Sequence, residues 1–169
     1  IKGAKVIGIA GSEEKRNFLL NKLKVDFAIN YKNQNVKEEL ESIAKDKIDI
    51  FFDNVGGEFL DTALMNINQS ARIAICGAIS GYNNETPAPG PSNYTALIIQ
   101  RARMEGFIVL DYMNRFPEAV AELMQWVQEG KIIYQEDIQE GIENAPETLL
   151  RLYTGKNKGK QLLKISDPD

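Results

Sequence analysis

Histidine is absent from the 169 residues and Cys76 is the only cysteine, which excludes several kinds of catalytic site. A Ser-His-Asp triad and a Cys-His pair both require histidine. Zinc sites that contain histidine are excluded for the same reason, and a single thiol cannot form a site of thiolates. Cys76 is expected to be a small buried strand residue, because no base is available to activate it. Chemistry in this chain must therefore use tyrosine, lysine, arginine, carboxylates, backbone groups or a bound cofactor.

The first apolar segment, residues 5–10, is followed by a Gly-Ser pair and then by Lys15 and Arg16. In dinucleotide-binding folds an acidic residue at this point holds the ribose 2′-hydroxyl of NAD, whereas a small residue with a cation suits the 2′-phosphate of NADP. The sequence therefore favours NADP, provided that Glu13 and Glu14 point away from the phosphate. The alternative is an ordinary helix start that the serine caps.

Two further apolar segments end in residues that suit a ligand. Tyr31 follows the second segment and could lie against the adenosine end of a dinucleotide, with packing as the alternative role. Asn54 follows the third segment and offers both a hydrogen-bond donor and an acceptor. Gly56 and Gly57 come next, and they let the backbone pass close to a ligand or make a tight turn.

A long segment rich in Gly, Pro and Asn runs from Gly77 to Asn93. Loops longer than about 12–15 residues are usually functional or disordered. Its first residues, 77–80, are small enough to present backbone N–H groups to a sugar or an amide. Tyr82 and Tyr94 are the nearest phenols, and each is a candidate proton donor or hydrogen-bond donor, with packing as the alternative.

Apolar segments alternate with helical periodicity along the chain, and this alternation predicts an α/β fold with a doubly wound parallel sheet. The predicted strands are residues 5–10, 27–31, 48–52, 71–76 and 107–110. The first predicted helix follows Ser12, which can cap it, and the other four cover 36–44, 59–67, 93–103 and 116–127. Beyond residue 131 the pattern predicts short extended pieces, a helix over 146–154 and a last strand over 161–165.

The composition limits the possible partners and the compartment. A net charge of −4 and the lack of a Lys/Arg-rich stretch argue against nucleic acid and against an anionic membrane surface. No apolar run approaches the roughly 20 residues that span a bilayer. A single cysteine forbids an internal disulfide and fits a reducing compartment, so the cytoplasm is the expected location.

Six stretches together resemble one enzyme family: GIAGSEEK, INYK, FFDNVGGEFLDT, RIAICGAISGYN, RARMEGFIV and GKNKGK. The resemblance is to the zinc-independent medium-chain dehydrogenases/reductases, and within them to the branch of prostaglandin reductases, plant alkenal double-bond reductases and bacterial curcumin reductases. It covers nearly the whole chain, and FDNVGGE followed by ICGAIS is its most specific part. The resemblance implies that NADPH donates a hydride to the C=C bond of an α,β-unsaturated ketone or aldehyde.

The resemblance also implies roles by position. Lys15 and Tyr31 would hold the 2′-phosphate end of NADPH, Asn54 would hold its middle, and Asn157 would reach it from the C-terminal segment. The residues implied at the nicotinamide end are Cys76, Gly77, Ala78, Ile79, Ser80, Gly81, Tyr82, Phe107, Ile108 and Val109.

Two further expectations follow from the resemblance. Some relatives carry a catalytic tyrosine where this chain reads Leu97-Ile98-Ile99, so Tyr82 or Tyr94 would have to replace that donor. A homodimer would form by pairing the edge strands of two sheets. The apolar segment Phe107–Leu110 is the expected edge, and pairing would protect it from aggregation.

No G-x-G-x-x-G phosphate loop follows any predicted strand. By the resemblance, residues 5–10 match the second strand of a Rossmann domain, and the first strand and its glycine-rich turn are expected before Ile1. Residues 1–130 would then form a partial cofactor-binding domain, and 131–169 a segment that returns to a substrate domain. We predict that the isolated chain binds NADPH poorly and does not turn over, because the pyrophosphate lacks its helix N-terminus.

Three other functions remain open from the sequence. A zinc-free NADPH quinone reductase would share the superfamily, and a quinone assay would separate it from an alkenal reductase. A non-catalytic module for nucleotide binding or dimerisation would need no glycine-rich loop. A methyltransferase that uses S-adenosylmethionine also has a doubly wound sheet, and it would bind that cofactor in preference to NADPH.

Overall fold

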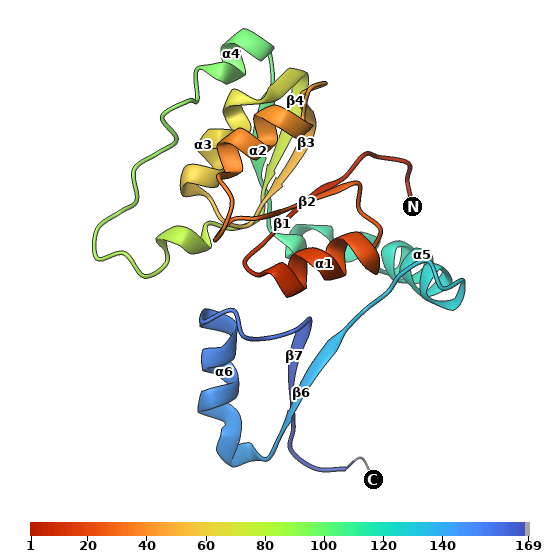
Figure 1. Ribbon diagram of the computed structural model, residues 1–169. Helices are drawn as coiled ribbons and strands as arrows, with labels where there is room; N and C mark the ends of the chain where they lie inside the picture. Colours follow the sequence, from red (N-terminus) through yellow and green to blue (C-terminus); the bar gives the residue numbers. More distant parts are fainter. Residues whose placement is uncertain (168–169) are drawn as a thin grey trace. The chain divides into compact units, whose positions relative to one another are not determined.

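The computed structural model describes residues 1–167, and its helices and strands alternate as the sequence predicts (Figure 1). The strands are β1 (Ile7–Ala10), β2 (Phe27–Asn30), β3 (Ile48–Asp53), β4 (Ile67–Ile75), β5 (Arg103–Gly106), β6 (Glu136–Glu140) and β7 (Lys160–Lys164). The α-helices are α1 (Glu13–Asn21), α2 (Val36–Ile43), α3 (Gly57–Met65), α4 (Ala96–Gln100), α5 (Phe116–Gln128) and α6 (Ala145–Tyr153). Short 3₁₀ segments are η1 (Ile79–Gly81), η2 (Val109–Arg115) and η3 (Ile142–Asn144).

The strand order supports a doubly wound sheet without its first strand. Every pairing of strands among the described residues is parallel. β1 pairs with β2, and β3, β4 and β5 form a second sheet in that order. In a 3-2-1-4-5-6 sheet these are the neighbours that remain when strand 1 is left out. The predicted α/β class is therefore confirmed.

The predicted strand 107–110 and the predicted helix 93–103 are wrong in their bounds. Helix α4 ends at Gln100 because Arg101 takes a left-handed φ of +49°. The strand that follows is β5, and only the backbone N–H of Phe107 continues its pairing, to the Ile75 carbonyl at 3.2 Å. β4 ends at Ile75, so no partner backbone remains for the apolar residues beyond Phe107.

The chain divides into two compact units, and each is described by itself. Unit 1 contains residues 1–32 and 120–169, with β1, β2, β6 and β7. Unit 2 contains residues 33–119, with β3, β4 and β5. The domain boundary expected near residue 131 is not decided by this division and stays a prediction.

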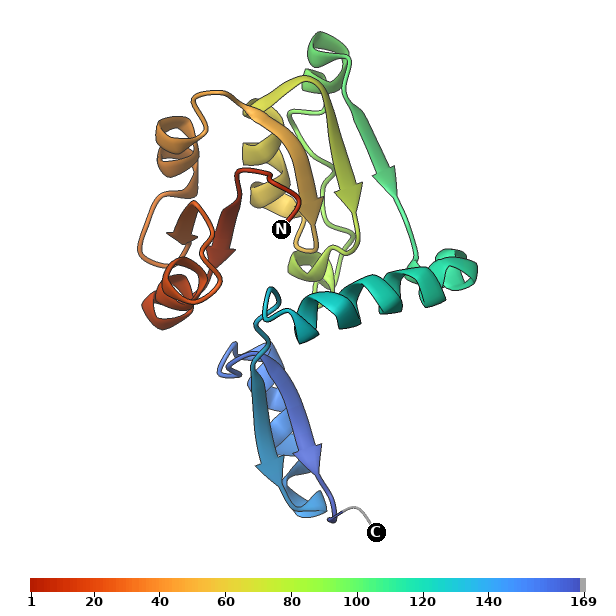
Figure 2. The same ribbon diagram turned by 90° about the vertical axis from the view of Figure 1, so that its right-hand side faces the viewer.

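Unit 2 is built around an apolar core on one face of its sheet. Figure 2 shows β3, β4 and β5 side by side. Leu60 and Leu64 of α3 pack against Ile67 and Ile73 of β4, and these four side chains are almost fully buried. Side chains alternate between the two faces of a sheet along each strand. On β3, Phe51 therefore packs against this core, whereas the next residue, Phe52, points to the opposite face and is 57% exposed.

Unit 1 contains two β–α–β elements. In the first, α1 connects the parallel strands β1 and β2, and Ile29 of β2 is its best-buried side chain. In the second, α6 connects the parallel strands β6 and β7. The turn between α6 and β7 carries Asn157, and the turn between β1 and α1 carries Ser12.

Candidate functional site

The end of β1 and the start of α1 carry the first group of candidate residues. Ser12 Oγ accepts a hydrogen bond from Lys15 N at 3.2 Å and caps α1, as expected. The Tyr31 ring lies close over Gly11, since a Cβ on that glycine would be 2.8 Å from the Tyr31 hydroxyl. Lys15 Nζ donates to the Gly155 carbonyl at 2.8 Å. Lys15 and Tyr31 therefore lie at the same end of the β1–β2 sheet.

The other charged residues of this helix start have different roles. Arg16 donates from Nε to the Ala28 carbonyl at 2.9 Å and pairs with Glu13 at 2.7 Å. It therefore ties α1 to β2, and it is not part of the candidate site. Glu14 pairs with Lys158 at 2.7 Å. Both acidic residues are thus engaged by cations.

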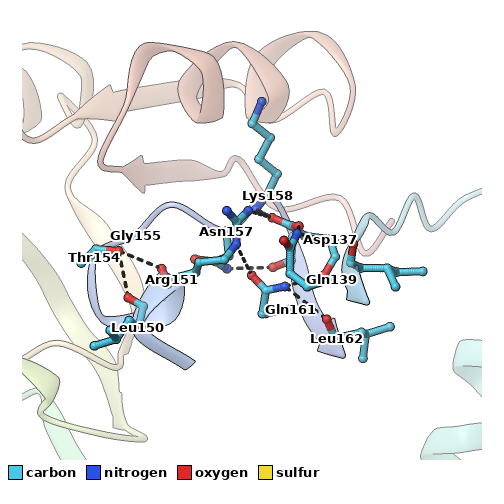
Figure 3. Close-up of polar contacts among 12 residues, drawn as sticks. Asp137, Gln139, Leu150, Arg151, Thr154, Gly155, Asn157, Lys158, Gln161 and Leu162 are labelled. Carbon is cyan, nitrogen blue, oxygen red and sulfur yellow. Dashed lines mark hydrogen bonds and ion pairs between the residues drawn. The ribbon is translucent and has the colours of Figure 1, made fainter. Parts of the chain in front are cut away.

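Asn157 lies in unit 1 with Lys15 and Tyr31, in the turn between α6 and β7. Its Nδ2 donates to the Gly159 carbonyl at 2.9 Å, so the turn itself orients the side chain (Figure 3). Gly159 has a φ of +89°, and a Cβ there would overlap the backbone carbonyl of Gln135. Only glycine fits this position, which fixes the path of the turn into β7.

A polar network on β6, α6 and β7 surrounds this turn (Figure 3). Asp137 of β6 accepts hydrogen bonds from Lys158 N at 2.9 Å and from the Arg151 guanidinium at 2.6 Å. The Lys158 backbone N–H, and after it Arg151, hold the pKa of Asp137 below its ordinary value. Sequence reasoning missed this cluster, because its members lie far apart along the chain and no local motif marks them.

In unit 2, the turn after β3 is organised by Asp53. Its carboxylate is buried, and Oδ1 accepts hydrogen bonds from Val55 N at 2.8 Å and Gly56 N at 2.9 Å. This arrangement bends the backbone at Asn54 and leads into α3. Sequence reasoning missed Asp53, although an Asp before a glycine-containing turn is a known signal for such self-bonding.

The turn after β3 is joined to the loop after β4 by backbone hydrogen bonds. They run from Cys76 N to Asp53 O (2.8 Å), from Ile79 N to Asn54 O (3.1 Å) and from Ser80 N to Val55 O (3.1 Å). Ser80 Oγ also donates to the Val55 carbonyl at 2.6 Å. A Cβ on Gly57, whose φ is +57°, would be 3.1 Å from that hydroxyl. Asn54 and Ser80 are therefore brought together at the carboxyl ends of β3 and β4.

An open cavity of about 580 Å³ lies at the carboxyl ends of β4 and β5. Its lining residues are Ile75, Cys76, Gly77, Ala78, Tyr82, Gly106, Phe107, Ile108 and Asp111. Six of these were expected at the nicotinamide end, whereas Ile75, Gly106 and Asp111 were not. Among the other expected residues, Ile79, Ser80, Gly81 and Val109 lie outside the lining. The prediction that Cys76 is buried is wrong, because β4 ends one residue earlier and leaves its thiol exposed.

The two candidate tyrosines differ in position. Tyr82 lines the cavity, and its hydroxyl oxygen accepts a hydrogen bond from Ala78 N at 3.3 Å. Both tyrosines are exposed, Tyr82 at 68% and Tyr94 at 58%, but Tyr94 lies outside the lining. On the other side of the cavity, the Phe107 ring contacts the Phe52 ring, with centroids 6.0 Å apart. The phenol that could act in the cavity is therefore Tyr82.

Two searches of the described residues gave negative results. Within residues 1–167, no cluster of three or more His, Cys, Asp or Glu side chains could hold a metal ion. In the same part of the chain, no helix combines the length and apolar character that crossing a membrane requires.

Comparison with known proteins identifies relatives along the whole chain. A family model described as "Zinc-binding dehydrogenase" matches residues 1–128. Prostaglandin reductase 1 of Rattus norvegicus is 45% identical over 97% of this chain, and the NADP(+)-dependent 2-alkenal reductase of Nicotiana tabacum is 43% identical over 97%. The chain spans about half the length of these curated relatives, 50% and 48%.

A solved structure matches equally broadly. The crystal structure of CurA from Vibrio vulnificus in complex with NADPH has a TM-score of 0.90 and 39% sequence identity to this chain. The match covers 99% of this chain and 51% of CurA.

Proposed function

Because the chain belongs to the zinc-binding dehydrogenase family, we propose that it is the cofactor-binding part of an NADPH-dependent reductase. Its substrates would be α,β-unsaturated ketones and aldehydes, whose C=C bond is reduced. The observation that carries the proposal is the likeness to CurA with NADPH, which extends over almost the whole chain. The identities of 43% and 45% with a 2-alkenal reductase and a prostaglandin reductase support the same chemistry.

The residues in unit 1 fit the adenosine end of NADPH. The Tyr31 hydroxyl lies beside Gly11 at the end of β1, and Lys15 lies in the first turn of α1 with its ammonium on the Gly155 carbonyl. A cation and a phenol suit the 2′-phosphate, and no carboxylate takes the place that would hold the 2′-hydroxyl of NAD. Asn157 would add an amide from the turn before β7. We therefore assign Lys15, Tyr31 and Asn157 to cofactor binding.

The residues in unit 2 fit the rest of the cofactor. Asn54 and the glycines beside it would contact its middle, and the cavity at Cys76–Ala78 would receive the nicotinamide. When bound there, NADPH supplies the hydride. Phe107 and Ile108 present apolar surface that would exclude water from the reacting atoms, with Val109 following them on the chain.

Tyr82 is the group that we propose to act on the substrate. Hydride addition to an enone leaves negative charge on the carbonyl oxygen, which needs a hydrogen-bond donor. The Tyr82 oxygen accepts from Ala78 N and keeps its own proton to donate. Tyr94 is the less suitable candidate, because it lies outside the cavity lining.

The metal in the family's name does not fit this chain. The sequence has no histidine and one cysteine, and the described residues offer no cluster of ligands. We therefore propose a zinc-independent reaction in which hydrogen bonds, with no metal ion, stabilise the oxygen.

We also propose a homodimer and a cytoplasmic location. β5 is the last strand of the β3–β4–β5 sheet, and it replaces residues 107–110 as the edge that a second copy would extend. Three exposed apolar side chains follow this edge: Ile108, Val109 and Leu110. Light scattering of the purified protein tests the dimer. The single cysteine supports the cytoplasm, since disulfides are rare there.

The proposal is tested by titrating the chain with NADPH, NADH and S-adenosylmethionine. We expect weak binding that prefers NADPH, and Lys15→Ala should abolish the preference for NADPH over NADH. Equal affinity for the two nicotinamide cofactors, or a preference for S-adenosylmethionine, would contradict it. Turnover is measured on the product of the complete gene, with an alkenal and a quinone as competing substrates. Faster NADPH consumption with the quinone would favour the quinone reductase reading.

A further inference from the structure

The turn that carries Asn157, residues 155–159, is held from outside by one carboxylate. Asp137 Oδ2 accepts hydrogen bonds from both Lys158 N and the Arg151 guanidinium (Figure 3). Lys158 N is the first backbone donor after Asn157, so this bond sets where the Asn157 backbone lies. A hydrogen bond to a charged acceptor is roughly twice as strong as a neutral one.

The carboxylate is itself fixed from two sides. Gln161 of β7 donates to the Asp137 carbonyl at 2.7 Å and accepts from Arg151 Nε at 2.9 Å. Gln139 donates to the other carboxylate oxygen at 2.9 Å. The Asp137 side chain is only 10% exposed, which keeps water from competing for it. Arg151 thus connects α6 to both strands and aims the carboxylate at the turn.

Two other charged contacts reach the turn: the Lys15 ammonium donates to the Gly155 carbonyl, two residues before Asn157, and the Lys158 ammonium pairs with Glu14. The Lys158 and Glu14 side chains are 55% and 66% exposed. Exposed ion pairs of this kind contribute little, because water and salt screen them. The Asp137 contact is therefore the stronger restraint on the residue next to Asn157.

We infer that Asp137 is a positioning residue for the cofactor-binding turn, with Arg151 orienting its carboxylate. This inference rests on the proposed function, since it assumes that Asn157 reaches NADPH. The carboxylate fixes the turn before the cofactor arrives, so that binding does not have to order it. The ion pair alone is not sufficient, because Lys158 N needs an acceptor on β6, and a charged acceptor makes the stronger bond.

Four variants of the 169-residue chain separate this role from general stabilisation. Asp137→Asn removes the charge, and Arg151→Lys keeps a charge but loses the two-pronged geometry. The double variant Asp137→Arg/Arg151→Asp restores an ion pair with its ends exchanged, and it leaves no carboxylate on β6. Glu129→Gln is the matched control. It breaks an ion pair of similar length, in which Glu129 and Lys131 are 2.6 Å apart, and neither residue belongs to the turn. For each variant, hydrogen exchange of the Lys158 amide and the affinity for NADPH are measured.

We expect Asp137→Asn to speed exchange at Lys158 and to weaken NADPH binding about tenfold, because a charged acceptor is replaced by a neutral one. The exchanged pair should recover thermal stability without recovering the slow exchange or the affinity. Glu129→Gln should behave as wild type. If Asp137→Asn does not fold, Arg151→Lys replaces it, with the same changes at about a third of the size.

Three results would overturn the inference. Unchanged Lys158 exchange in the Asp137 or Arg151 variants would show that the carboxylate does not hold the turn. Faster exchange with unchanged NADPH affinity would show that the turn does not serve the cofactor, and so would recovery of affinity in the exchanged pair. A wild-type chain that binds no NADPH would instead reject the proposed function, while Lys158 exchange, which needs no cofactor, would still report on the turn.

Discussion

The turn after β3 and the turn before β7 both carry a candidate cofactor residue, Asn54 in one and Asn157 in the other. The Asn54 turn belongs to unit 2, which has a packed apolar core. The backbone of this turn also accepts hydrogen bonds from the loop after β4. In the β6–α6–β7 element the second turn is surrounded by charged and amide groups, and Thr148 is the one residue of 136–164 that is classed as buried. The turn at Asn54 is therefore held by buried groups, which are the core, the Asp53 carboxylate and backbone hydrogen bonds, whereas polar side chains outside any apolar core hold the turn at Asn157.

This difference has consequences for how each turn responds to change. Apolar packing depends on shape and volume, and it is insensitive to pH and salt. A carboxylate network depends on the protonation of one group and on exact hydrogen-bond geometry. Core mutations should therefore affect the turn at Asn54 and not the turn at Asn157, whereas loss of the Asp137 carboxylate should affect only the turn at Asn157.

The largest expected effect comes from truncating the core below the Asn54 turn. Leu64→Ala removes a side chain that is 1% exposed, and we expect a loss of about 2–5 kcal/mol in unfolding free energy. Leu149→Ala on α6 is the control, since that side chain is 53% exposed and its loss should cost less than about 0.5 kcal/mol. Urea denaturation measures both. Similar losses in the two variants would contradict the comparison.

A smaller effect is expected at the carboxylate that shapes the Asn54 turn. Asp53→Ala leaves the N–H groups of Val55 and Gly56 without their acceptor, at a cost of about 1–3 kcal/mol. Asp53→Asn keeps an oxygen that can accept these bonds, so it should cost less than the alanine variant. Urea denaturation gives the ranking. An equal cost for both variants would mean that the negative charge, rather than the acceptor geometry, matters at this turn.

The two carboxylates also show how far sequence could lead. Asp53 bonds to residues two and three positions along the chain, so the local pattern DNVGG contained the information. Asp137 bonds to Lys158 and Arg151, and no local pattern indicates which distant N–H group a fold will bring to a strand.

The same limit explains the errors in the predicted elements. Residues 107–110 are apolar and predicted a strand, yet the paired residues are Arg103–Gly106, of which two are charged and only Met104 has an apolar side chain. An edge strand needs backbone pairing on one side only, so its side chains carry little apolar signal. The longer helical stripes were predicted well, because α2, α3 and α5 each repeat apolar residues over two turns or more.

Acid should weaken the hydrogen bonds of Asp137 to the Asn157 turn without any mutation. The pKa of Asp137 is lowered from its ordinary 3.8, first by the Lys158 N–H and then by Arg151. A lowered pKa means that the carboxylate stabilises the folded state fully above about 3.8, and that this contribution is lost as the pH falls through the lowered value. The NMR signals of the Asp137 carboxyl carbon and the Lys158 amide should titrate together there, and independent titration of the two signals would contradict the prediction.

Arg151→Gln sharpens the acid experiment. It removes the second cause of the shift and leaves the first, so the pKa of Asp137 should rise part of the way towards 3.8. A full return of the pKa to 3.8 would mean that the hydrogen bond from Lys158 N to Asp137 was lost as well. The Arg151 guanidinium would then be the group that holds the turn. No change at all would contradict the role of Arg151 in the network.

The smallest effect is expected at an ion pair outside both turns. Arg103 and Glu105 approach to 2.9 Å on β5, with side chains 72% and 60% exposed. Because solvent screens such a pair, Glu105→Gln should change the unfolding free energy by no more than about 0.5 kcal/mol. Its bond length resembles that of the Asp137–Arg151 pair, which is 2.6 Å with side chains only 10% and 25% exposed. Urea denaturation could give the same loss of unfolding free energy for Glu105→Gln and Asp137→Asn. That result would mean that neither exposure nor a backbone hydrogen-bond partner makes one ion pair more important than the other. The contrast between a turn held by buried groups and one held by a half-buried charge network would then lose its basis.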